Sequence, residues 1–293
     1  MERAVVDVGQ LQGAEQLIRE SVARSLDADR VVPVLVVVAV LGLVIGSFVN
    51  VVVWRVPRGL SIVSPPSACP RCNRPIRAWE NIPVFSWLAL RGRCRGCRQP
   101  ISLRYPAVEL GTSVLFVLLA IRTGISLSTP PYLYLAAIGV ALALIDLDVR
   151  RLPNSIVLPA YPVGVALLAV ASWGRGDWPA LIRAGIGAGV LFALYFAMMA
   201  GSAVLIGSTG MGFGDVKLAG VLGLFLAWLG WGELVVGAFS GFLLGGIFSI
   251  GLLASGRANR KTGVPFGPWM LSGALVGVAW GGSLWASYLG LLG

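Results

Sequence analysis

The sequence Gly212-Phe213-Gly214-Asp215 leads directly into the apolar run VKLAGVLGLFLAWLGW, residues 216–231. A run of this length and composition is typical of a helix that crosses a membrane. Asp215 therefore places an ionisable carboxyl where a glycine-containing loop enters a membrane helix. A carboxylate at this depth is costly and usually faces a partner or a watery cavity, so Asp215 is a candidate functional residue.

Similar apolar runs recur along the whole chain of 293 residues, which is 57% hydrophobic and only 12% charged. A hydrocarbon core about 30 Å thick needs roughly 20 apolar helical residues to cross it. We therefore predict an all-α polytopic membrane protein with about eight transmembrane helices. The predicted spans are residues 31–54, 106–126, 131–147, 155–173, 181–206, 216–231, 234–255 and 268–291.

The first thirty residues are polar and mixed in charge, and they lack the short apolar core of a cleavable signal peptide. Leu17, Ile18, Val22 and Leu26 recur at helical spacing. Residues 1–30 are therefore expected to be a polar extension, either an amphipathic helix or a partly ordered tail.

The net charge of +10 is unevenly distributed, and its distribution indicates membrane topology rather than a nucleic-acid partner. The loop after the first span, residues 55–105, contains Arg55, Arg58, Arg71, Arg74, Arg77, Arg91, Arg93, Arg95, Arg98 and Arg104. By the positive-inside rule this loop is cytoplasmic, and both termini lie outside. Successive loops alternate between the two sides of the membrane. The cytoplasmic loops are therefore expected to contain also Arg150, Arg151, Lys217, Arg257, Arg260 and Lys261.

The four cysteines form two C-x2-C pairs in this loop, Cys69/Cys72 and Cys94/Cys97, with 21 residues between the pairs. Two such pairs can complete a tetrahedral zinc shell, and structural disulfides rarely persist in the cytoplasm. The chain has no histidine that could act as a ligand. The spacing predicts a structural zinc ion held by four cysteines, with labile disulfides or free thiols as the alternative. A closed shell has no open position for catalysis, so the metal is expected to hold the loop.

A second acid, Asp146, lies near the end of span three in the sequence ALALIDLDVRRLPN, residues 141–154. It precedes Pro153 by seven residues, about 10 Å along a helix axis, which places it at the depth of Asp215. Two neighbouring carboxyls share a proton, so that one acts as general base and the other as general acid. This pair predicts aspartyl protease chemistry. The alternative is two ordinary interfacial acids, balanced by Arg150 and Lys217.

Asp148 competes with Asp146 for the first catalytic place. The two lie roughly 200° apart around a helix, so both cannot face the same partner, and Asp146 is preferred because it lies deeper. Without histidine, the Ser-His-Asp and Cys-His arrangements are excluded. Glycines before Asp215 allow unusual backbone conformations and close approach of a substrate chain. The expected substrate loop contains Gly207, Gly210, Gly212, Phe213 and Gly214, followed by Lys217.

The chain resembles the bacterial type IV prepilin peptidases, which are membrane aspartyl proteases of the GxGD type. The resemblance covers nearly all of the chain after residue 40. It is carried by Gly46-Ser-Phe-Val-Asn50, Arg55-Val-Pro-Arg-Gly-Leu-Ser61, the two cysteine pairs around Asn81-Ile-Pro83 and Ser86-Trp87, Arg91-Gly-Arg-Cys94, Ile101-Ser-Leu-Arg-Tyr-Pro106, Glu109, Asp146 with Leu152-Pro153-Asn154, Gly212-Phe-Gly-Asp215-Val-Lys217 and Pro265-Phe-Gly-Pro268.

The resemblance implies two activities at the cytoplasmic face of the bacterial inner membrane. Asp146 and Asp215 would cleave the basic leader of a prepilin or pseudopilin, and the new N-terminus would then be methylated with S-adenosylmethionine as donor. The family pattern supports Asp146, the carboxyl seven residues before the proline, over Asp148. The cysteine loop marks the bifunctional form of the family, although no donor-binding signature is visible. Glu109 is expected to orient this loop, and Glu233 to be an outer-surface charge.

The predicted organisation is an extension over residues 1–30, a first transmembrane helix over 31–54, the zinc domain over 55–105 and a seven-helix peptidase domain over 106–293. Lipid and the pilin substrate are the expected partners. A different class of function is a proton-coupled transporter that uses the two aspartates as a relay. Such a transporter more often shows internal repeats, and none is found here.

Overall fold

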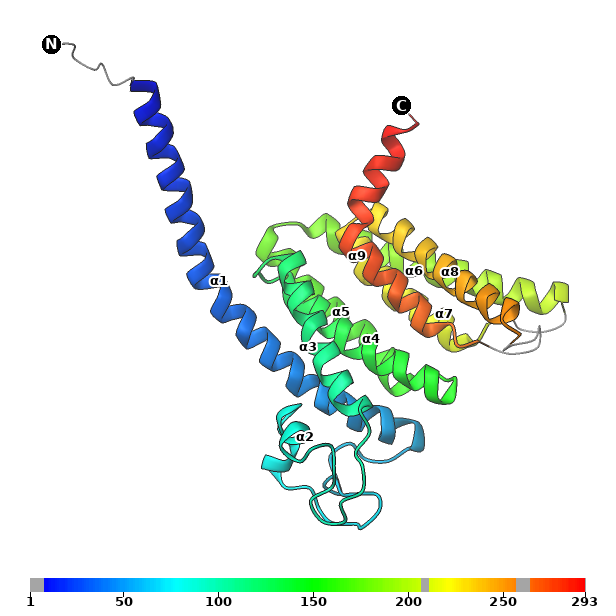
Figure 1. Ribbon diagram of the computed structural model, residues 1–293. Coiled ribbons are helices and arrows are strands. Elements are labelled where there is room, and N and C mark those ends of the chain that lie inside the picture. Colours follow the sequence, from blue (N-terminus) through cyan, green and yellow to red (C-terminus); the bar gives the residue numbers. More distant parts are fainter. Residues whose placement is uncertain (1–7, 207–210, 257–263, 293) are drawn as a thin grey trace.

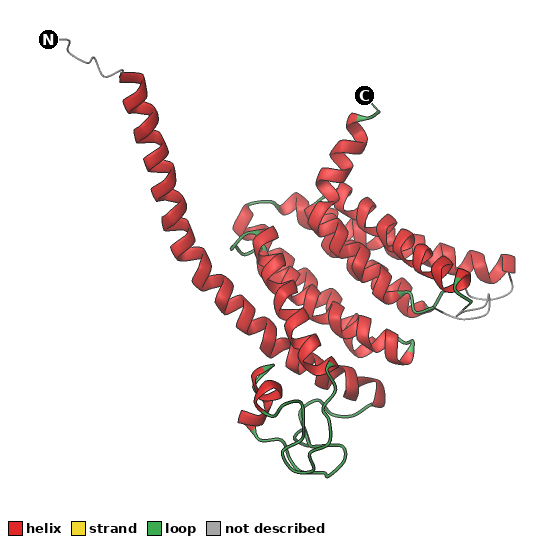
Figure 2. Ribbon diagram, in the orientation of Figure 1, coloured by secondary structure: helices red, strands yellow, loops and turns green. Residues whose placement is uncertain are grey.

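The computed structural model describes residues 8–206, 211–256 and 264–292 (Figure 1). Helices and loops account for all of these residues, and the described ranges contain no strand (Figure 2). The described residues form eight long helices: α1 (Val8–Arg55), α3 (Arg104–Thr123), α4 (Thr129–Val149), α5 (Asn154–Arg175), α6 (Trp178–Ile206), α7 (Phe213–Leu229), α8 (Trp231–Ala254) and α9 (Gly267–Gly290). Each of them overlaps most of one predicted span, so the predicted all-α class is confirmed.

Six helical segments in the described residues are long and apolar enough to cross a membrane: Val31–Arg58, Arg104–Thr123, Thr129–Val149, Asn154–Arg175, Trp178–Val204 and Trp231–Ala254. Large apolar side chains on their outer faces, such as Val37, Ile182 and Phe239, are more than half exposed. Apolar surface of this extent is stable only when something covers it. Lipid covers it in a polytopic membrane protein.

Helices α7 and α9 were also predicted as spans, but neither is among the six segments that are long and apolar enough to cross a membrane. Helix α7 has only 17 residues, about 25 Å of length, and its residues from Val216 to Trp228 are buried almost without interruption. A helix that is apolar on every side belongs inside a bundle. Helix α7 is therefore the central helix of the fold, and α5, α6, α8 and α9 pack around it.

Small residues bring these helices close together. A Cβ atom at Gly223 of α7 would collide with the backbone of Gly187 of α6, and one at Gly273 of α9 would collide with α8 at Gly241. Glycine contacts of this kind are typical of helices that pack in membranes. The core is therefore held by backbone approach as well as by large side chains.

The C-terminal end of α7 is capped by a side chain from another helix. The last carbonyl groups of a helix have no partner within that helix. Arg183 of α6 donates Nε to the carbonyl of Ala227 at 2.6 Å and Nη2 to that of Trp228 at 2.7 Å. This contact lets α7 end inside the bundle without leaving buried acceptors unpaired.

Helix α1 runs without a break through the boundary predicted between residues 30 and 31, and it contains Pro33. It packs on α3, where Gly46 lies against the backbone of Glu109 and Asn50 donates to the carbonyl of Tyr105 at 3.3 Å. The amphipathic face predicted for residues 17–26 depends on side chains that are not among those the structure describes. The other predicted positions outside the described residues are Gly207, Gly210, Arg257, Arg260 and Lys261.

Candidate active site

Asp146 lies in the last turn of α4 and is only 5% exposed. Its Oδ2 accepts a hydrogen bond of 2.9 Å from the backbone N–H of Gly267, the first residue of α9. The first N–H groups of a helix lack intrahelical acceptors, and the positive end of the helix dipole favours a carboxylate. The start of α9 therefore holds one oxygen of Asp146.

Gly267 leaves almost no space between α9 and this carboxyl. A Cβ atom at position 267 would lie 2.8 Å from Asp146 Oδ2 and 3.4 Å from Leu152 Cδ2. Any larger residue would have to displace the carboxyl, so the glycine of the Pro265–Pro268 motif has a steric role.

Asp215 lies in the first turn of α7 and is partly buried. Its Oδ2 accepts the backbone N–H of Gly212, the residue that precedes the helix, at 3.1 Å. An acid in the first turn often bonds back to the N-cap residue in this way. Each aspartate therefore has one oxygen bound by a backbone N–H group of a glycine.

Gly212 and Gly214, the two described glycines before Asp215, do not need unusual backbone angles. Gly212 has φ −77°, which any residue can adopt, and Gly214 is inside α7. A Cβ atom at Gly214 would lie 3.1 Å from Cβ of Leu152. Because Leu152 also borders Gly267, it packs between the start of α7, which carries Asp215, and the start of α9, which binds Asp146.

The fold brings Asp146 and Asp215 to the same end of the bundle, although 68 positions separate them in the sequence. The two carboxyls are close enough to interact electrostatically. Tyr195 of α6 is also within electrostatic range of Asp215, and its ring packs on Phe242 at 5.2 Å. Phe266, the residue before Gly267, packs on both rings, with its ring centre 6.5 Å from that of Tyr195 and 5.3 Å from that of Phe242, so aromatic side chains lie next to the backbone donor of Asp146.

Asp148 has a different partner. Both of its carboxylate oxygens accept hydrogen bonds from Arg104, at 2.9 and 2.7 Å. This bidentate pair ties the end of α4 to the start of α3 at an exposed position. Asp146 and Asp148 therefore face different surroundings, as expected from their separation around the helix.

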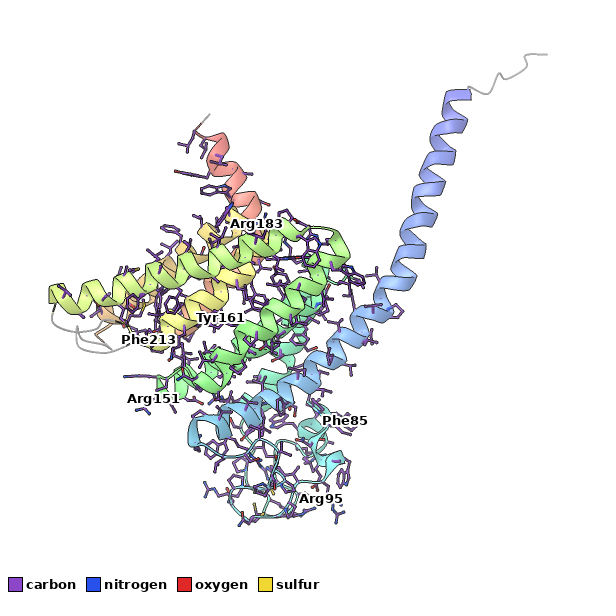
Figure 3. All side chains as sticks on the ribbon, turned by 180° about the vertical axis from the view of Figure 1, so that it is seen from behind. Phe85, Arg95, Arg151, Tyr161, Arg183 and Phe213 are labelled. Carbon is purple, nitrogen blue, oxygen red and sulfur yellow. The ribbon has the colours of Figure 1, made fainter. Side chains whose placement is uncertain are left out.

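Lys217 does not balance Asp215 directly. Its Nζ donates to Asn154 Oδ1 at 2.9 Å and lies 4.6 Å from the ring centre of Phe213, which is exposed. In the part of the chain that the structure describes, no ion pair joins Lys217 to Asp215 or Arg150 to Asp146. Figure 3 shows Phe213 and Arg151 at one end of the bundle, far from Arg183.

The four cysteines come together in the loop between α1 and α3. All four sulfur atoms lie within 4.8 Å of one another, with Cys69 and Cys97 at 3.8 Å and Cys72 and Cys94 at 4.0 Å. Thiolates bound to one zinc ion lie about 3.8 Å apart. None of the four forms a disulfide. The residues present therefore fit a metal ion with four sulfur ligands.

The two cysteine pairs have the same local structure. In the first, the N–H of Asn73 donates to the carbonyl of Cys69 at 2.9 Å, and in the second, Arg98 donates to Cys94 at 2.9 Å. Both donors have positive φ, 56° and 58°. The N–H groups of Cys72 and Arg71 lower the pKa of the Cys69 thiol to about 6, whereas burial and the three neighbouring thiols raise the pKa of Cys97 to about 11, so Cys69 is the first of these two thiols to ionise.

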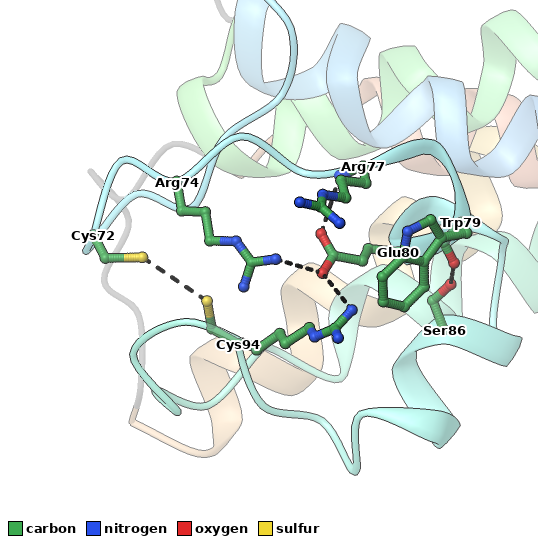
Figure 4. Close-up of polar contacts among 8 residues, drawn as sticks. Cys72, Arg74, Arg77, Trp79, Glu80, Ser86 and Cys94 are labelled. Atoms are coloured by element: carbon green, nitrogen blue, oxygen red, sulfur yellow. Dashed lines mark hydrogen bonds and ion pairs between the residues drawn. The ribbon is translucent and has the colours of Figure 1, made fainter.

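Glu80 joins the two halves of this loop, a role that was not predicted from its position in the sequence. Arg74, beside the first pair, contacts Glu80 Oε1 at 3.0 Å, and Arg95, within the second pair, contacts it at 3.7 Å (Figure 4). The N–H of Arg77 donates to the other oxygen at 3.0 Å. This N–H group and then the guanidinium groups of Arg74 and Arg95 lower the pKa of Glu80.

Glu109 of α3 fixes the other side of the loop. Its buried Oε2 accepts the N–H of Val84 at 2.7 Å, and Val84 has φ 60°, an uncommon value for a β-branched residue. Val84 precedes the short helix α2 (Phe85–Ala89). The expectation that Glu109 orients the loop is confirmed.

These features define a class of protein: a polytopic helical membrane protein with two acids at one end of the bundle and a four-cysteine loop. Residues 40–123 match the model of the bacterial peptidase A24 N-terminal domain, and residues 133–250 match that of the type IV leader peptidase family. The chain belongs to the type IV leader peptidase family, and it is an enzyme. The resemblance inferred from the motifs is confirmed, and the transporter alternative finds no support.

Several relatives are similar over most of their length, and each is named prepilin leader peptidase/N-methyltransferase. The relative from Aeromonas salmonicida is 39% identical over 273 residues, which cover 84% of this chain and 91% of the relative. The relative from Pseudomonas putida is 37% identical over 276 residues, 87% of this chain and 93% of the relative. The relative from Neisseria gonorrhoeae is 39% identical over 244 residues, which cover 75% of this chain and 82% of the relative. No solved structure gives a significant match.

Proposed function

We propose that this protein removes the leader peptide of a type IV prepilin or pseudopilin and then methylates the new N-terminus. The names of its relatives support both activities. The observation that carries the peptidase assignment is the placement of Asp146 and Asp215 at one end of the bundle, each with one oxygen held by a backbone N–H. The apolar helices and the relatives support a location in the bacterial inner membrane.

The hydrolytic step uses the two carboxyls in opposite protonation states. The ionised carboxyl takes a proton from water as the water oxygen attacks the scissile carbonyl carbon. The protonated carboxyl gives its proton to the amide nitrogen as the C–N bond breaks, which releases the leader and a free amine. The N–H groups of Gly267 and Gly212 hold one Oδ2 each, and neither Oδ1 accepts a hydrogen bond from the described residues, so Oδ1 of each residue is proposed to meet water and substrate.

The methylation step uses S-adenosylmethionine, which supplies an electrophilic methyl group to the new N-terminal amine. The cysteine loop, residues 55–105, is proposed to serve this step, and Cys69, Cys72, Cys94 and Cys97 would hold a structural zinc ion that keeps the loop folded. The loop and the aspartates are proposed to face the cytoplasm. The arginines of the loop and the basic residues Arg150, Arg151 and Lys217 near the aspartates support this sidedness.

The two activities can be tested together. Purified protein is incubated with a prepilin and methyl-labelled S-adenosylmethionine, and the product is examined by mass spectrometry. We expect a pilin that lacks its leader and carries label on its N-terminal amine. An intact prepilin after incubation with folded protein would contradict the peptidase assignment, and cleavage without label would contradict the methyltransferase assignment alone.

A further inference from the structure

A polar cavity lies at the end of the bundle opposite the two aspartates. It has a volume of about 210 Å³ and is lined by residues that include Arg122, Thr123, Ser128, Arg175, Trp228 and Glu233. These residues come from α3, α5, α7, α8 and the connection before α4. One water needs roughly 10–15 Å³ of such space, so the cavity can hold a group much larger than a water molecule.

Two arginines and one acid line this cavity. Arg122 donates Nε to the carbonyl of Ala279 at 3.0 Å, and its two terminal nitrogen atoms make no hydrogen bond with the described residues. The guanidinium of Arg175 lies 5.0 Å from the ring centre of Trp228. Among the described residues, no ion pair joins either arginine to Glu233. The cavity therefore offers two cationic groups and one anionic group to a ligand.

The cavity lies at the depth of lipid headgroups. Trp173, Trp178 and Trp231 are at the ends of α5, α6 and α8 next to the cavity, and all three are exposed. Exposed tryptophans at helix ends mark the membrane–water interface. From Thr129 to Asp146, α4 spans about 25 Å, so this interface is the one opposite the aspartates.

We propose that this cavity binds the headgroup of a zwitterionic phospholipid of the phosphatidylethanolamine type. Arg122 and Arg175 receive the phosphate, since guanidinium groups form strong charge-assisted hydrogen bonds with phosphate oxygens. Glu233 receives the ammonium group. Glu233 lies in the first turn of α8. A purely anionic headgroup would leave Glu233 unpaired and would be repelled by it.

Native mass spectrometry of the delipidated full chain in detergent tests this proposal, with equimolar phosphatidylethanolamine and phosphatidylglycerol added. We expect one phosphatidylethanolamine to be retained at least about 3-fold over phosphatidylglycerol. Arg175→Gln and Arg122→Gln should lose this retention. The matched control is Arg151→Gln, which removes the same charge at an exposed position at the other end of the bundle and should bind like the wild type.

Glu233→Gln tests the proposed contact with the ammonium group separately from the contacts with the phosphate. We expect it to lower phosphatidylethanolamine retention while phosphatidylglycerol retention stays the same or rises. Equal retention of both lipids by the wild type, or wild-type retention by Arg175→Gln, would overturn the proposal. Displacement of the lipid by soluble O-phosphoethanolamine at similar concentration would also overturn it, because the site would then recognise a soluble phosphate ester rather than a lipid.

Discussion

The backbone N–H of Gly267 donates a hydrogen bond of 2.9 Å to Oδ2 of Asp146, 121 residues earlier in the chain. This bond joins the start of α9 to the end of α4. It makes α9 a third element of the candidate active site, although α9 contributes no acidic side chain. A backbone donor at a helix start also favours a carboxylate without adding a competing side chain.

Substitution of Gly267 by alanine tests this relationship. The new Cβ atom would meet Asp146 Oδ2 at 2.8 Å, so the carboxyl must move. Because a displacement near 1 Å can cost on the order of 100-fold in rate, we expect a loss of about that size in kcat for leader cleavage. Gly246→Ala is the matched control, since a Cβ atom there has no neighbour within 4 Å. Equal rates for the two variants would contradict the role of Gly267.

The pair between Arg104 and Asp148 should affect stability slightly and cleavage little. Both side chains are about 40% exposed, at 42% and 39%, so solvent screens the pair and its contribution is under about 1 kcal/mol. Arg104→Gln, Asp148→Asn and the double variant are compared by thermal unfolding in detergent. Because the two side chains act as one pair, we expect the double variant to be no less stable than the less stable of the two single variants. Fully additive losses would show that the two side chains act independently.

Metal analysis tests the cysteine cluster. We expect about one zinc per chain in protein purified under reducing conditions, because four sulfur atoms form one tetrahedral shell. Cys72→Ser should lose the metal and make residues 59–103 sensitive to protease. Arg71→Gln, which changes the neighbouring side chain but keeps its backbone N–H, should retain both the metal and protease resistance. A metal-free wild type would remove the structural-site assignment.

The Glu80 network predicts a pH dependence for the loop. The pKa of Glu80 is lowered from 4.5 in the folded state, so the folded loop binds fewer protons than the unfolded loop between the two pKa values. The stabilisation is complete above pH 4.5 and is lost as the pH falls through the lowered pKa. We expect Glu80→Gln to be less stable than the wild type at pH 7 and the difference to shrink below pH 4.5. Limited proteolysis of residues 59–103 follows this unfolding, and a difference that does not change with pH would contradict the assignment.

Apolar run lengths were sufficient to predict the eight long helices, because crossing a membrane requires long apolar segments whatever their neighbours. The same rule did not show that α7 is the central helix. Its 17 residues read as one more span, whereas its position depends on glycine contacts with α6 and on Arg183 at its C-terminal end. Contacts between distant helices leave no periodic signal in one sequence.

The candidate site was predictable in its side chains and not in its backbone. Asp146, Asp215 and the four cysteines were selected as candidates because acids in membrane helices and C-x2-C pairs are informative residue types. The donor at Gly267 is a main-chain group, which every residue except proline possesses, so its role depends on the fold alone. Glu80 was missed because one acid in a loop rich in arginine has no distinctive spacing.

The most direct test of the account is cleavage of a prepilin by three single variants, Asp146→Asn, Asp215→Asn and Asp148→Asn, at equal amounts of folded protein. Each change keeps the size of the side chain and removes one ionisable carboxyl. We expect Asp146→Asn and Asp215→Asn each to lose cleavage by on the order of 100-fold or more, since general acid–base catalysis contributes that much. Asp148→Asn should cleave like the wild type. Full cleavage by either of the first two, or a loss confined to Asp148→Asn, would contradict the proposed dyad.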